Sequence, residues 1–346
     1  MANLTLDFYE SGQGETIIIT FPSGGLGIVD AHPSPLDTRP SIVELVNGRP
    51  IHFVCLTHPH ADHGTDLVPL VQSGAQIDSF WHTIFDMPAF IYGIGQTVSF
   101  PSPLRDFSVR MNKNWGEFFL DLMGAVVEKQ IPRHTLRSDL AVHEIDGVEI
   151  HCIGPDEQIQ NNFFDAYNKR LKNASAQLPD PNLLSAILVL KYGESVAILG
   201  ADALKPNWAN AVKQFNKKVV KKAVALKVPH HGARNAFDFQ KDAAAYLNIC
   251  STDPRAKAVL FAGDSKHPDD DVFSKLHSKT EIICVNNGKK PQAMNGNPLN
   301  LQMPGASVVQ TPLTCNAVVR FELLADGNCL VSAGGRCEFC LNGAGA

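Results

Sequence analysis

Apolar residues occur along the chain in short runs that predict strands alternating with helices. Buried strands are predicted at Leu26–Val29 and His52–Leu56, and helical spacing of apolar residues follows at Thr65–Ser73. The alternation returns later in the chain, where a strand at Ser195–Leu199 precedes a helix at Asn207–Ala223. Strand, polar elbow and helix in succession are typical of an α/β fold.

Three segments depart from this alternation. Residues 84–137 combine proline-rich loops with a helix-like run, which predicts a mostly helical insertion in the sheet framework. Residues 286–312 are rich in Asn, Gly, Pro and Gln and predict a long loop. Residues 313–346 predict a β-hairpin turning at Asp326-Gly327, followed by a cysteine-bearing tail. Because the motifs described below are spread along the chain, we predict a single domain over residues 1–346.

Composition excludes several classes of protein. Hydrophobic residues make up 44% and charged residues 19% of the 346 residues, so disorder does not describe the chain as a whole. Its longest apolar runs fall far below the ~20 residues of a membrane span, and its N-terminus alternates like a strand rather than a signal peptide. We therefore expect a cytoplasmic protein with no membrane contact. The eight irregularly spaced cysteines predict reduced thiols.

Four potential metal ligands are concentrated at the end of one predicted strand. His58, His60, Asp62 and His63 lie within six residues. Imidazole and carboxylate groups suit Zn²⁺ or Mn²⁺. On such an elbow His58 and His60 can bind one ion while Asp62 and His63 reach a second. The alternative is a polar loop that happens to be rich in histidine.

This segment resembles the His-x-His-x-Asp-His signature of the metallo-β-lactamase superfamily. The resemblance implies a four-layer αββα sandwich, with the insertion and the hairpin as additions. It also implies that Asp30 orients the loop of residues 58–63, called the metal loop below. Asp202, in Gly200-Ala201-Asp202, would bridge two metal ions. For Asp202 alone the alternative is a helix N-cap, which is common, but its order in the chain and its place at a strand end favour the ligand role.

A second block resembles one branch of that superfamily, the hydrolase domains of competence-type (ComEC-like) proteins. Pro229-His230-His231-Gly232 is similar to the His-His-Gly block of this branch, which implies His231 as a metal ligand and His230 as a substrate contact with a catalytic role. The order of the two histidines stays open. The stretches at Gly154-Pro155 and His267-Pro268 are similar to further blocks of the branch.

The chain departs from the superfamily pattern at the first metal. A further histidine often completes that site, and the candidates in the required interval lack the usual Gly-His context. They are His82, His134, His143 and His151. Without one of them, the first ion is expected to be bound by His58, His60 and Asp202 alone.

The distribution of charge offers information about the substrate that the net charge of −5 hides. Residues 203–237 contain eight basic residues and no acidic one, a pattern that fits an anionic substrate. A solvated helix face is the alternative for the lysines before residue 222. Lys227, Arg234 and His267 lie beside the metal motifs, so we predict them as phosphate contacts.

The C-terminal cysteines allow a second kind of metal site. Cys337 and Cys340 form a Cys-x-x-Cys pair, and Cys315 and Cys329 lie on or beside the predicted hairpin. Four thiolates of this kind can hold a structural zinc ion. Since a second Cys-x-x-Cys pair is missing, four ordinary thiols are the favoured alternative.

Together these features predict a metal-dependent hydrolase with two divalent ions, Zn²⁺ or Mn²⁺, and a hydroxide held between them. Asp62 would direct that hydroxide, and Asp202 and His230 would complete the catalytic set. We expect a phosphodiester substrate in a nucleic acid or nucleotide. Two alternatives remain open: hydrolysis of a lactone, thioester or β-lactam, and a metal-bound binding or effector protein that meets a protein partner through the insertion or the tail.

Overall fold

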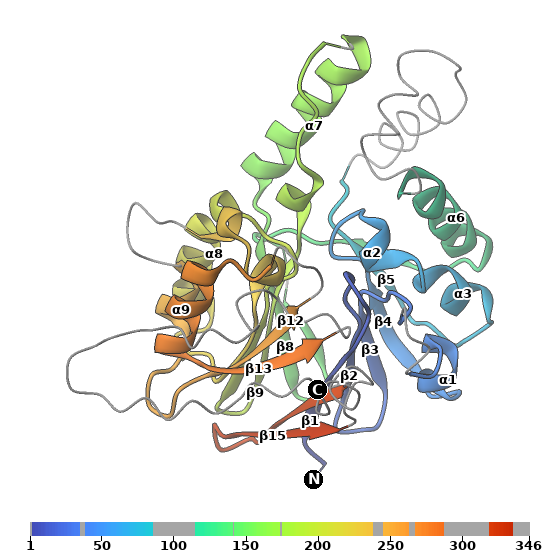
Figure 1. Cartoon of the computed structure of the whole chain (residues 1–346). Coiled ribbons are helices and arrows are strands. Elements are labelled where there is room, and N and C mark those ends of the chain that lie inside the picture. Colours follow the sequence, from blue (N-terminus) through green and yellow to red (C-terminus); the bar gives the residue numbers. More distant parts are fainter. Residues whose placement is uncertain are drawn as a thin grey trace, which may run out of the picture.

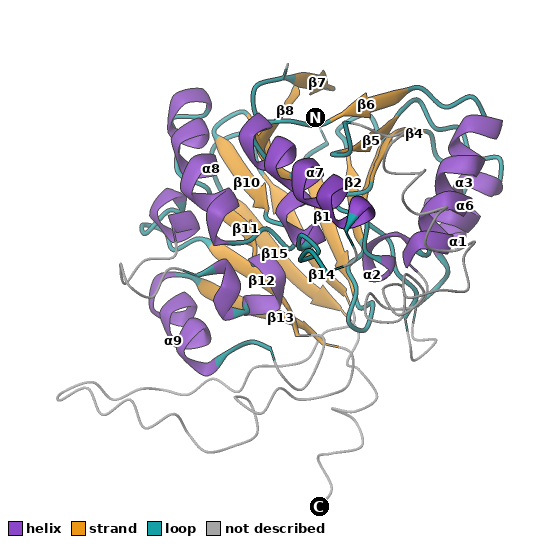
Figure 2. Cartoon of the chain, turned by 90° about the horizontal axis from the view of Figure 1, so that it is seen from above, coloured by secondary structure: helices purple, strands orange, loops and turns teal. Residues whose placement is uncertain are grey.

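Two mixed β-sheets form the centre of the protein, and helices lie outside them (Figures 1 and 2). The computed structural model describes residues 2–34, 39–85, 115–140, 142–173, 175–237, 245–262, 267–286 and 318–334. Within these ranges the first sheet contains, in spatial order, β15 (Cys329–Gly334), β14 (Val318–Leu323), β1 (Leu4–Tyr9), β2 (Ile17–Thr20), β3 (Leu26–Val29), β4 (Ile51–Cys55), β5 (Phe80–His82) and β6 (Arg133–Thr135). The second contains β13 (Glu281–Asn286), β12 (Lys257–Ala262), β11 (Ala225–Lys227), β10 (Ser195–Leu199), β9 (Ile187–Tyr192), β8 (Val148–Gly154) and β7 (His143–Ile145).

Helices cover the outer faces of both sheets (Figure 2). On the first sheet these are α1 (Ile42–Val46), α3 (Leu67–Gln72) and α6 (Trp115–Glu128), with the short α2 (Ala61–Gly64) at its end. Helices α8 (Lys205–Lys218) and α9 (Asp270–Lys279) cover the second sheet. Helix α7 (Glu157–Lys172) projects from the end of the sandwich (Figure 1). In the described part of the chain, no helix is long and apolar enough to cross a membrane.

Three apolar layers hold the four structural layers together. Inward-facing side chains of both sheets meet in the middle layer, where Phe53 stacks on Trp81 with ring centroids 3.9 Å apart. Leu70 and Phe119 bring the outer helices onto the first sheet, and Trp208 does so on the second. Because strands present alternate side chains to opposite faces, both faces of each sheet are buried. The predicted four-layer α/β sandwich is confirmed.

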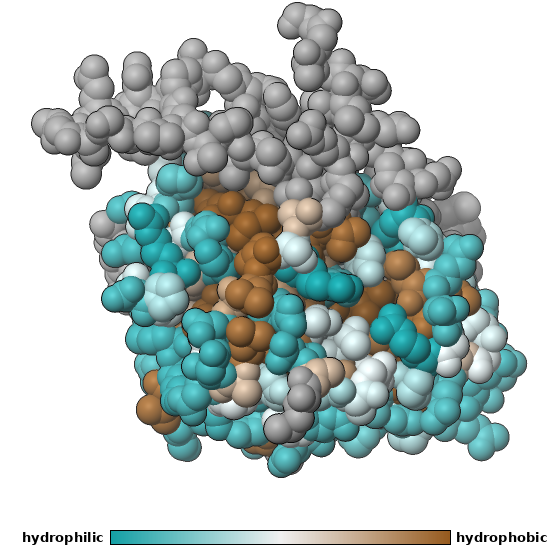
Figure 3. All heavy atoms as spheres, turned by 90° about the horizontal axis from the view of Figure 1, so that it is seen from below, coloured by the Kyte–Doolittle hydropathy of each residue, from teal (hydrophilic) through white to brown (hydrophobic). Residues whose placement is uncertain are grey.

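The predicted hairpin is present as β14 and β15, and β14 pairs with β1, so the last described strands complete the first sheet. The paired carboxylate of Asp7 and guanidinium of Arg320 link these strands at 2.6 and 2.8 Å. Seen from below, this end of the molecule carries patches of apolar side chains interrupted by polar ones (Figure 3). Residues 86–114 of the predicted insertion and the predicted loop at 287–312 lie outside the described residues, so the division of the chain stays a prediction.

Parallel pairing brings the ends of four strands to one edge of the sandwich. Strand β3 pairs in parallel with β4, and β10 pairs in parallel with β11. Asp30 directly follows β3. Asp202 follows β10 closely, and His230 follows β11 closely. The carboxyl ends of parallel strands are a common place for a binding site in α/β folds.

Candidate metal centre

Strained backbone marks the strand ends where the candidate ligands lie. Asp30, Ala201, His230 and His231 have φ angles of 54°, 43°, 44° and 52°. They are four of the eight non-glycine residues with left-handed backbone in the described ranges. This conformation costs on the order of 1–3 kcal/mol and persists where the surroundings enforce it.

Asp30 lies beneath the metal loop and is fully buried. Its carboxylate accepts hydrogen bonds from the backbone N–H and the hydroxyl of Thr57, at 2.8 and 2.6 Å. It also lies 2.7 Å from Nδ1 of His63. When this nitrogen donates to Asp30, the other nitrogen of the ring, Nε2, is left to face the cluster, which is how carboxylates orient metal-binding histidines.

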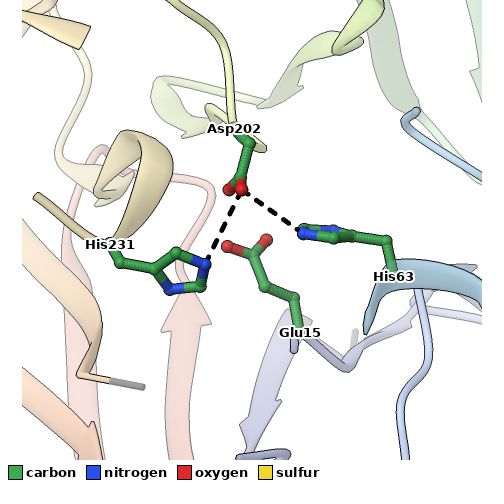
Figure 4. A group of neighbouring side chains, drawn as sticks. All are labelled: Glu15, His63, Asp202 and His231. Atoms are coloured by element: carbon green, nitrogen blue, oxygen red, sulfur yellow. Dashed lines mark ion pairs between the residues drawn. The ribbon is translucent and has the colours of Figure 1, made fainter. Parts of the chain in front are cut away.

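Four buried side chains from separate parts of the chain converge above Asp30 (Figure 4). They are Glu15, which precedes β2; His63, in α2; Asp202, which follows β10; and His231, in the short helix η2 (Pro229–Gly232). One nitrogen or oxygen atom of each lies within 4.8 Å of those of the others. Oδ2 of Asp202 is 3.5 Å from Nε2 of His63 and 3.7 Å from Nε2 of His231.

The chemistry of this group fits a divalent ion. Nε2 of His63 is buried and makes no hydrogen bond, a costly arrangement unless something else binds it. Two imidazoles with carboxylates are a common donor set for zinc. Two ligands bonded at roughly 2.1 Å to one tetrahedral ion lie about 3.4 Å apart, close to the observed separations.

Burial and the neighbouring charges also set the pKa values of these groups. Burial lowers the pKa of His58 well below its ordinary value and lowers that of His231 to about 4. For His63 the effect of burial is outweighed by the carboxylates of Asp202 and Asp30, and its pKa is raised well above the ordinary value. Burial would raise the pKa of Asp202, but His231, His230 and His63 lower it well below the ordinary value. The neutral imidazoles of His58 and His231 are in the form that binds metal.

The remaining residues of the loop border this group without belonging to it. His58 is buried and His60 half-buried, and Nε2 of His58 lies 3.0 Å from Nδ1 of His60. The rings of His58 and His63 are 4.2 Å apart, centroid to centroid. Asp62 is half-buried. The structure thus places His58 and His60 next to His63, and the number of ions stays a prediction.

Glu15 is the member of the group that the sequence did not predict. Its side chain is fully buried, and burial raises its pKa to about 7, with Lys227 and His63 opposing this rise. The backbone N–H of Glu15 donates to the carbonyl of Asp62 at 3.2 Å, which joins the β1–β2 turn to the metal loop. The available signal was an acidic residue between a glycine-rich turn and a buried strand.

The predicted substrate contacts fall in different surroundings. The side chain of His230 is 16% exposed, and its Nε2 lies 3.8 Å from Oδ2 of Asp202. The ring of His267 is 6.0 Å from that of His230, so the two histidines border the group together. Arg234 is exposed and pairs with Asp271 at 2.9 Å.

Lys227 requires a correction. Its side chain is fully buried and its ammonium is ion-paired with Glu15, so it lies beneath the candidate ligands. A group buried in this way is not placed to meet a phosphate at the surface. The run of basic residues indicated its charge, but it gave no information on burial.

The histidines considered for the first metal lie elsewhere. His151 on β8 contacts Glu149 at 3.2 Å. His134 and His143 lie on β6 and β7, with ring centroids 5.6 Å apart, and His82 is buried on β5. In the described ranges, none of them joins the group around Asp202.

The predicted cysteine site is only partly within the described residues. Cys329 begins β15 and is partly exposed, with a free thiol. Cys315, Cys337 and Cys340 lie outside the described residues. A structural zinc ion at this end of the chain stays a prediction.

Gly14 lets the β1–β2 turn approach the metal loop. A Cβ atom at this position would lie 2.1 Å from the carbonyl oxygen of Asp62 and 2.5 Å from Cβ of His32. We therefore expect Gly14→Ala to lower the free energy of unfolding by about 1–3 kcal/mol, a typical cost of overpacking. The measurement is urea-induced unfolding.

Gly124→Ala provides the matched control. Gly124 lies in α6, and a Cβ atom added there would meet no neighbouring part of the described chain within 4 Å. This change is therefore expected to raise helix stability by up to about 1 kcal/mol. Equal stability of Gly14→Ala and the wild type would contradict the close approach.

No protein-family model and no curated protein matches the chain. Among solved structures, Tm1679, a metal-dependent hydrolase of the β-lactamase superfamily, is 11% identical; the match covers 82% of this chain and 96% of that one, with a TM-score of 0.43. The metallo-β-lactamase fold protein YhfI from Bacillus subtilis is 10% identical, with 81% and 96% covered and a TM-score of 0.42. A variant of CmlA β-hydroxylase is 11% identical with a TM-score of 0.44; the match covers 82% of this chain and spans about half of that protein, 53%. At this level of similarity these structures carry no argument about activity.

Proposed function

We propose that this protein is a metal-dependent hydrolase of the metallo-β-lactamase superfamily. The observation that carries the proposal is the buried group of His63, Asp202 and His231, whose ligand atoms converge at the carboxyl ends of the parallel strands. The unsatisfied, buried Nε2 of His63 supports a bound ion. The neighbouring His58 and His60 supply further imidazoles for a second ion of the same site.

The residues of the site have separate tasks in this proposal. Asp30 fixes the orientation of the His63 ring. One carboxylate oxygen of Asp202, Oδ2, lies between His63 and His231 and faces both. A divalent ion bound there would lower the pKa of a water molecule and neutralise charge that develops on the substrate. Asp62 and His60 are half-buried, so they remain within reach of a substrate and of the attacking water.

For the substrate we propose a phosphodiester of a nucleic acid or nucleotide. His230 and His267 lie beside the cluster and can donate hydrogen bonds to phosphate oxygens. The resemblance of the His230-His231-Gly232 block to ComEC-like hydrolase domains supports the same choice.

The run of basic residues supports this choice less than its length indicates, because protein groups already engage several of its lysines. Lys218 donates to a backbone carbonyl, and Lys221 pairs with Glu194. Lys222 donates to the carbonyl of Asn248. The charges of these three lysines are thus partly compensated by protein groups, which leaves them less able to attract an anionic substrate.

Alanine variants of the metal loop test the activity. We expect His60→Ala and Asp62→Ala to reduce turnover of bis(nitrophenyl) phosphate by more than roughly 100-fold, because losing even one positioned catalytic group has an effect of this size. Circular dichroism should show the fold retained, since both side chains are only half-buried. Unchanged turnover in either variant would contradict the mechanism.

A substrate panel distinguishes the remaining alternatives. Hydrolysis of a lactone or of nitrocefin, without hydrolysis of the phosphodiester, would replace the proposed substrate class and keep the metal site. Stoichiometric metal with no turnover of any ester would instead indicate a binding protein.

A further inference from the structure

Between the two sheets, beside His63, Asp202 and His231, lies a buried ion pair. We propose that Glu15 and Lys227 are positioning residues that fix the orientation of the Asp202 carboxylate. Glu15 belongs to the turn before β2 in the first sheet, and Lys227 is the last residue of β11 in the second. Both side chains are at most 1% exposed. The inference rests on the proposed metal site and is independent of the substrate.

The ammonium group of Lys227 contacts three polar groups, all of them part of the site. It is ion-paired with Oε1 of Glu15, it donates a hydrogen bond to the carbonyl of Ala201 at 2.7 Å, and it lies 3.6 Å from Oδ1 of Asp202. A buried ammonium needs such partners, because an unpaired charge in the interior is strongly unfavourable. Lys227 thereby links Glu15 to Ala201 and Asp202, which follow β10.

The two carboxylate oxygens of Asp202 face different partners. Oδ1 faces Lys227, whereas Oδ2 faces Nε2 of His63, His230 and His231 at 3.5, 3.8 and 3.7 Å. This division fixes the rotation of the carboxyl group, since the charge on one side is cationic and fixed. Oδ2 is therefore presented to the imidazoles before an ion binds.

The same lysine also holds the backbone of the elbow. Ala201 has a left-handed φ of 43°, and its carbonyl oxygen accepts hydrogen bonds from both Lys227 Nζ and the backbone N–H of His230, the second at 3.0 Å. A strained turn keeps its geometry only when its surroundings enforce it. These two hydrogen bonds are among the contacts that hold the turn.

Charge compensation explains why an acidic residue accompanies the lysine. Without Glu15, a buried cation would lie 3.6 Å from Asp202 and compete with a metal ion for its negative charge. When Glu15 is ionised the pair is neutral overall, so Asp202 keeps a charge to offer to the ion. Oε2 of Glu15 makes no hydrogen bond and points into the group, as Figure 4 shows for the whole carboxylate.

Glu15→Gln, Lys227→Met and the double variant test this arrangement. Two quantities are measured in each: the zinc dissociation constant, by competition with a chelator, and the melting temperature of the metal-free protein. We expect each single variant to bind zinc roughly 10- to 100-fold more weakly, the range found for residues that orient metal ligands. Each single variant should also melt at a lower temperature than the wild type, because a buried charge is left unpaired.

The double variant separates positioning from stability. Removing both charges is expected to restore most of the lost melting temperature, while zinc affinity stays at least roughly 10-fold below that of the wild type because Asp202 is no longer held. Wild-type zinc affinity in the double variant would overturn the proposal. So would tighter zinc binding by Lys227→Met, which would show the lysine to be a competitor of the ion. If a single variant fails to fold, the double variant decides.

A matched control uses the ion pair between Lys257 and Glu281 on the neighbouring strands β12 and β13. Lys257→Met with Glu281→Gln likewise removes one positive and one negative charge, here both from the second sheet, and zinc affinity should not change. A wild-type protein that binds no zinc would contradict the metal site itself. In that case, additive effects of Glu15→Gln and Lys227→Met on melting temperature would still show the pair to be uncoupled.

Discussion

Replacing Asp202 with asparagine is expected to weaken zinc binding by more than roughly 100-fold and to reduce hydrolysis to the background rate. Asp202 is a direct candidate ligand, so its loss should exceed the effect of losing a residue that only orients one. Its Oδ2 lies within 3.8 Å of three imidazoles, and the amide keeps the shape but removes the charge. The measurements are a zinc titration against a competing chelator and turnover of bis(nitrophenyl) phosphate.

Asp326→Asn serves as the control for this variant. Asp326 lies in the exposed turn between β14 and β15, where its carboxylate accepts the backbone N–H of Asn328. This substitution changes the same functional group at the surface and should leave both measurements unaltered. Wild-type zinc affinity in Asp202→Asn would remove Asp202 from the site.

The second large effect is expected for Asp30→Ala. This change leaves the N–H and hydroxyl of Thr57 and the Nδ1 of His63 without their shared acceptor in a fully buried position. Removing one partner of a buried charged pair in this way lowers the free energy of unfolding by about 3–5 kcal/mol. Chemical unfolding of the metal-free protein measures this cost.

Asp30→Asn separates the structural role of Asp30 from its effect on metal binding. Asparagine tolerates the left-handed backbone at this position, and its carbonyl oxygen can still accept from Thr57. The amide cannot reproduce the charge that orients His63, so zinc binding should fall roughly 10- to 100-fold while more of the stability is kept. Wild-type stability and zinc affinity in Asp30→Ala would show that this carboxylate orients nothing.

The sequence predicts best the part of the site that is local in the chain. His58, His60 and His63 are close in sequence, so their convergence follows from one elbow at the end of one strand. Asp202 was predicted from the resemblance of Gly200-Ala201-Asp202 to a superfamily motif, together with its place after a buried strand. The parallel pairing of β10 with β11 brings the ends of these two strands to one edge. Left-handed backbone at Ala201 could not be anticipated, since alanine is not a residue that favours it.

Glu15 was missed because only the fold brings it close to His63. The turn before β2 reaches the metal loop through the pairing of β2 with β3 and the contact at Gly14, neither of which leaves a signal in sequence spacing. Lys227 was misinterpreted for a related reason. A run of basic residues indicates the sign of a charge, whereas its burial depends on a partner from the other sheet.

Helix α7, outside the site, also has a feature that the sequence pattern does not reveal. Its apolar face is narrow, and Gln160, which occupies a buried position on it, is polar. The amide of Gln160 donates to the backbone carbonyls of Thr83 and Leu136, which lie far away in the sequence. The polar residue is therefore compatible with burial only because of tertiary contacts, and no helical pattern in the sequence reveals them.

The central claim is that a metal ion binds between the two sheets at His63, Asp202 and His231. Anomalous scattering at the zinc absorption edge, from crystals grown with zinc, tests it most directly. We expect a peak at roughly 2.0–2.2 Å from Nε2 of His63, Oδ2 of Asp202 and Nε2 of His231. A zinc-loaded crystal with no peak among these three atoms would contradict the claim.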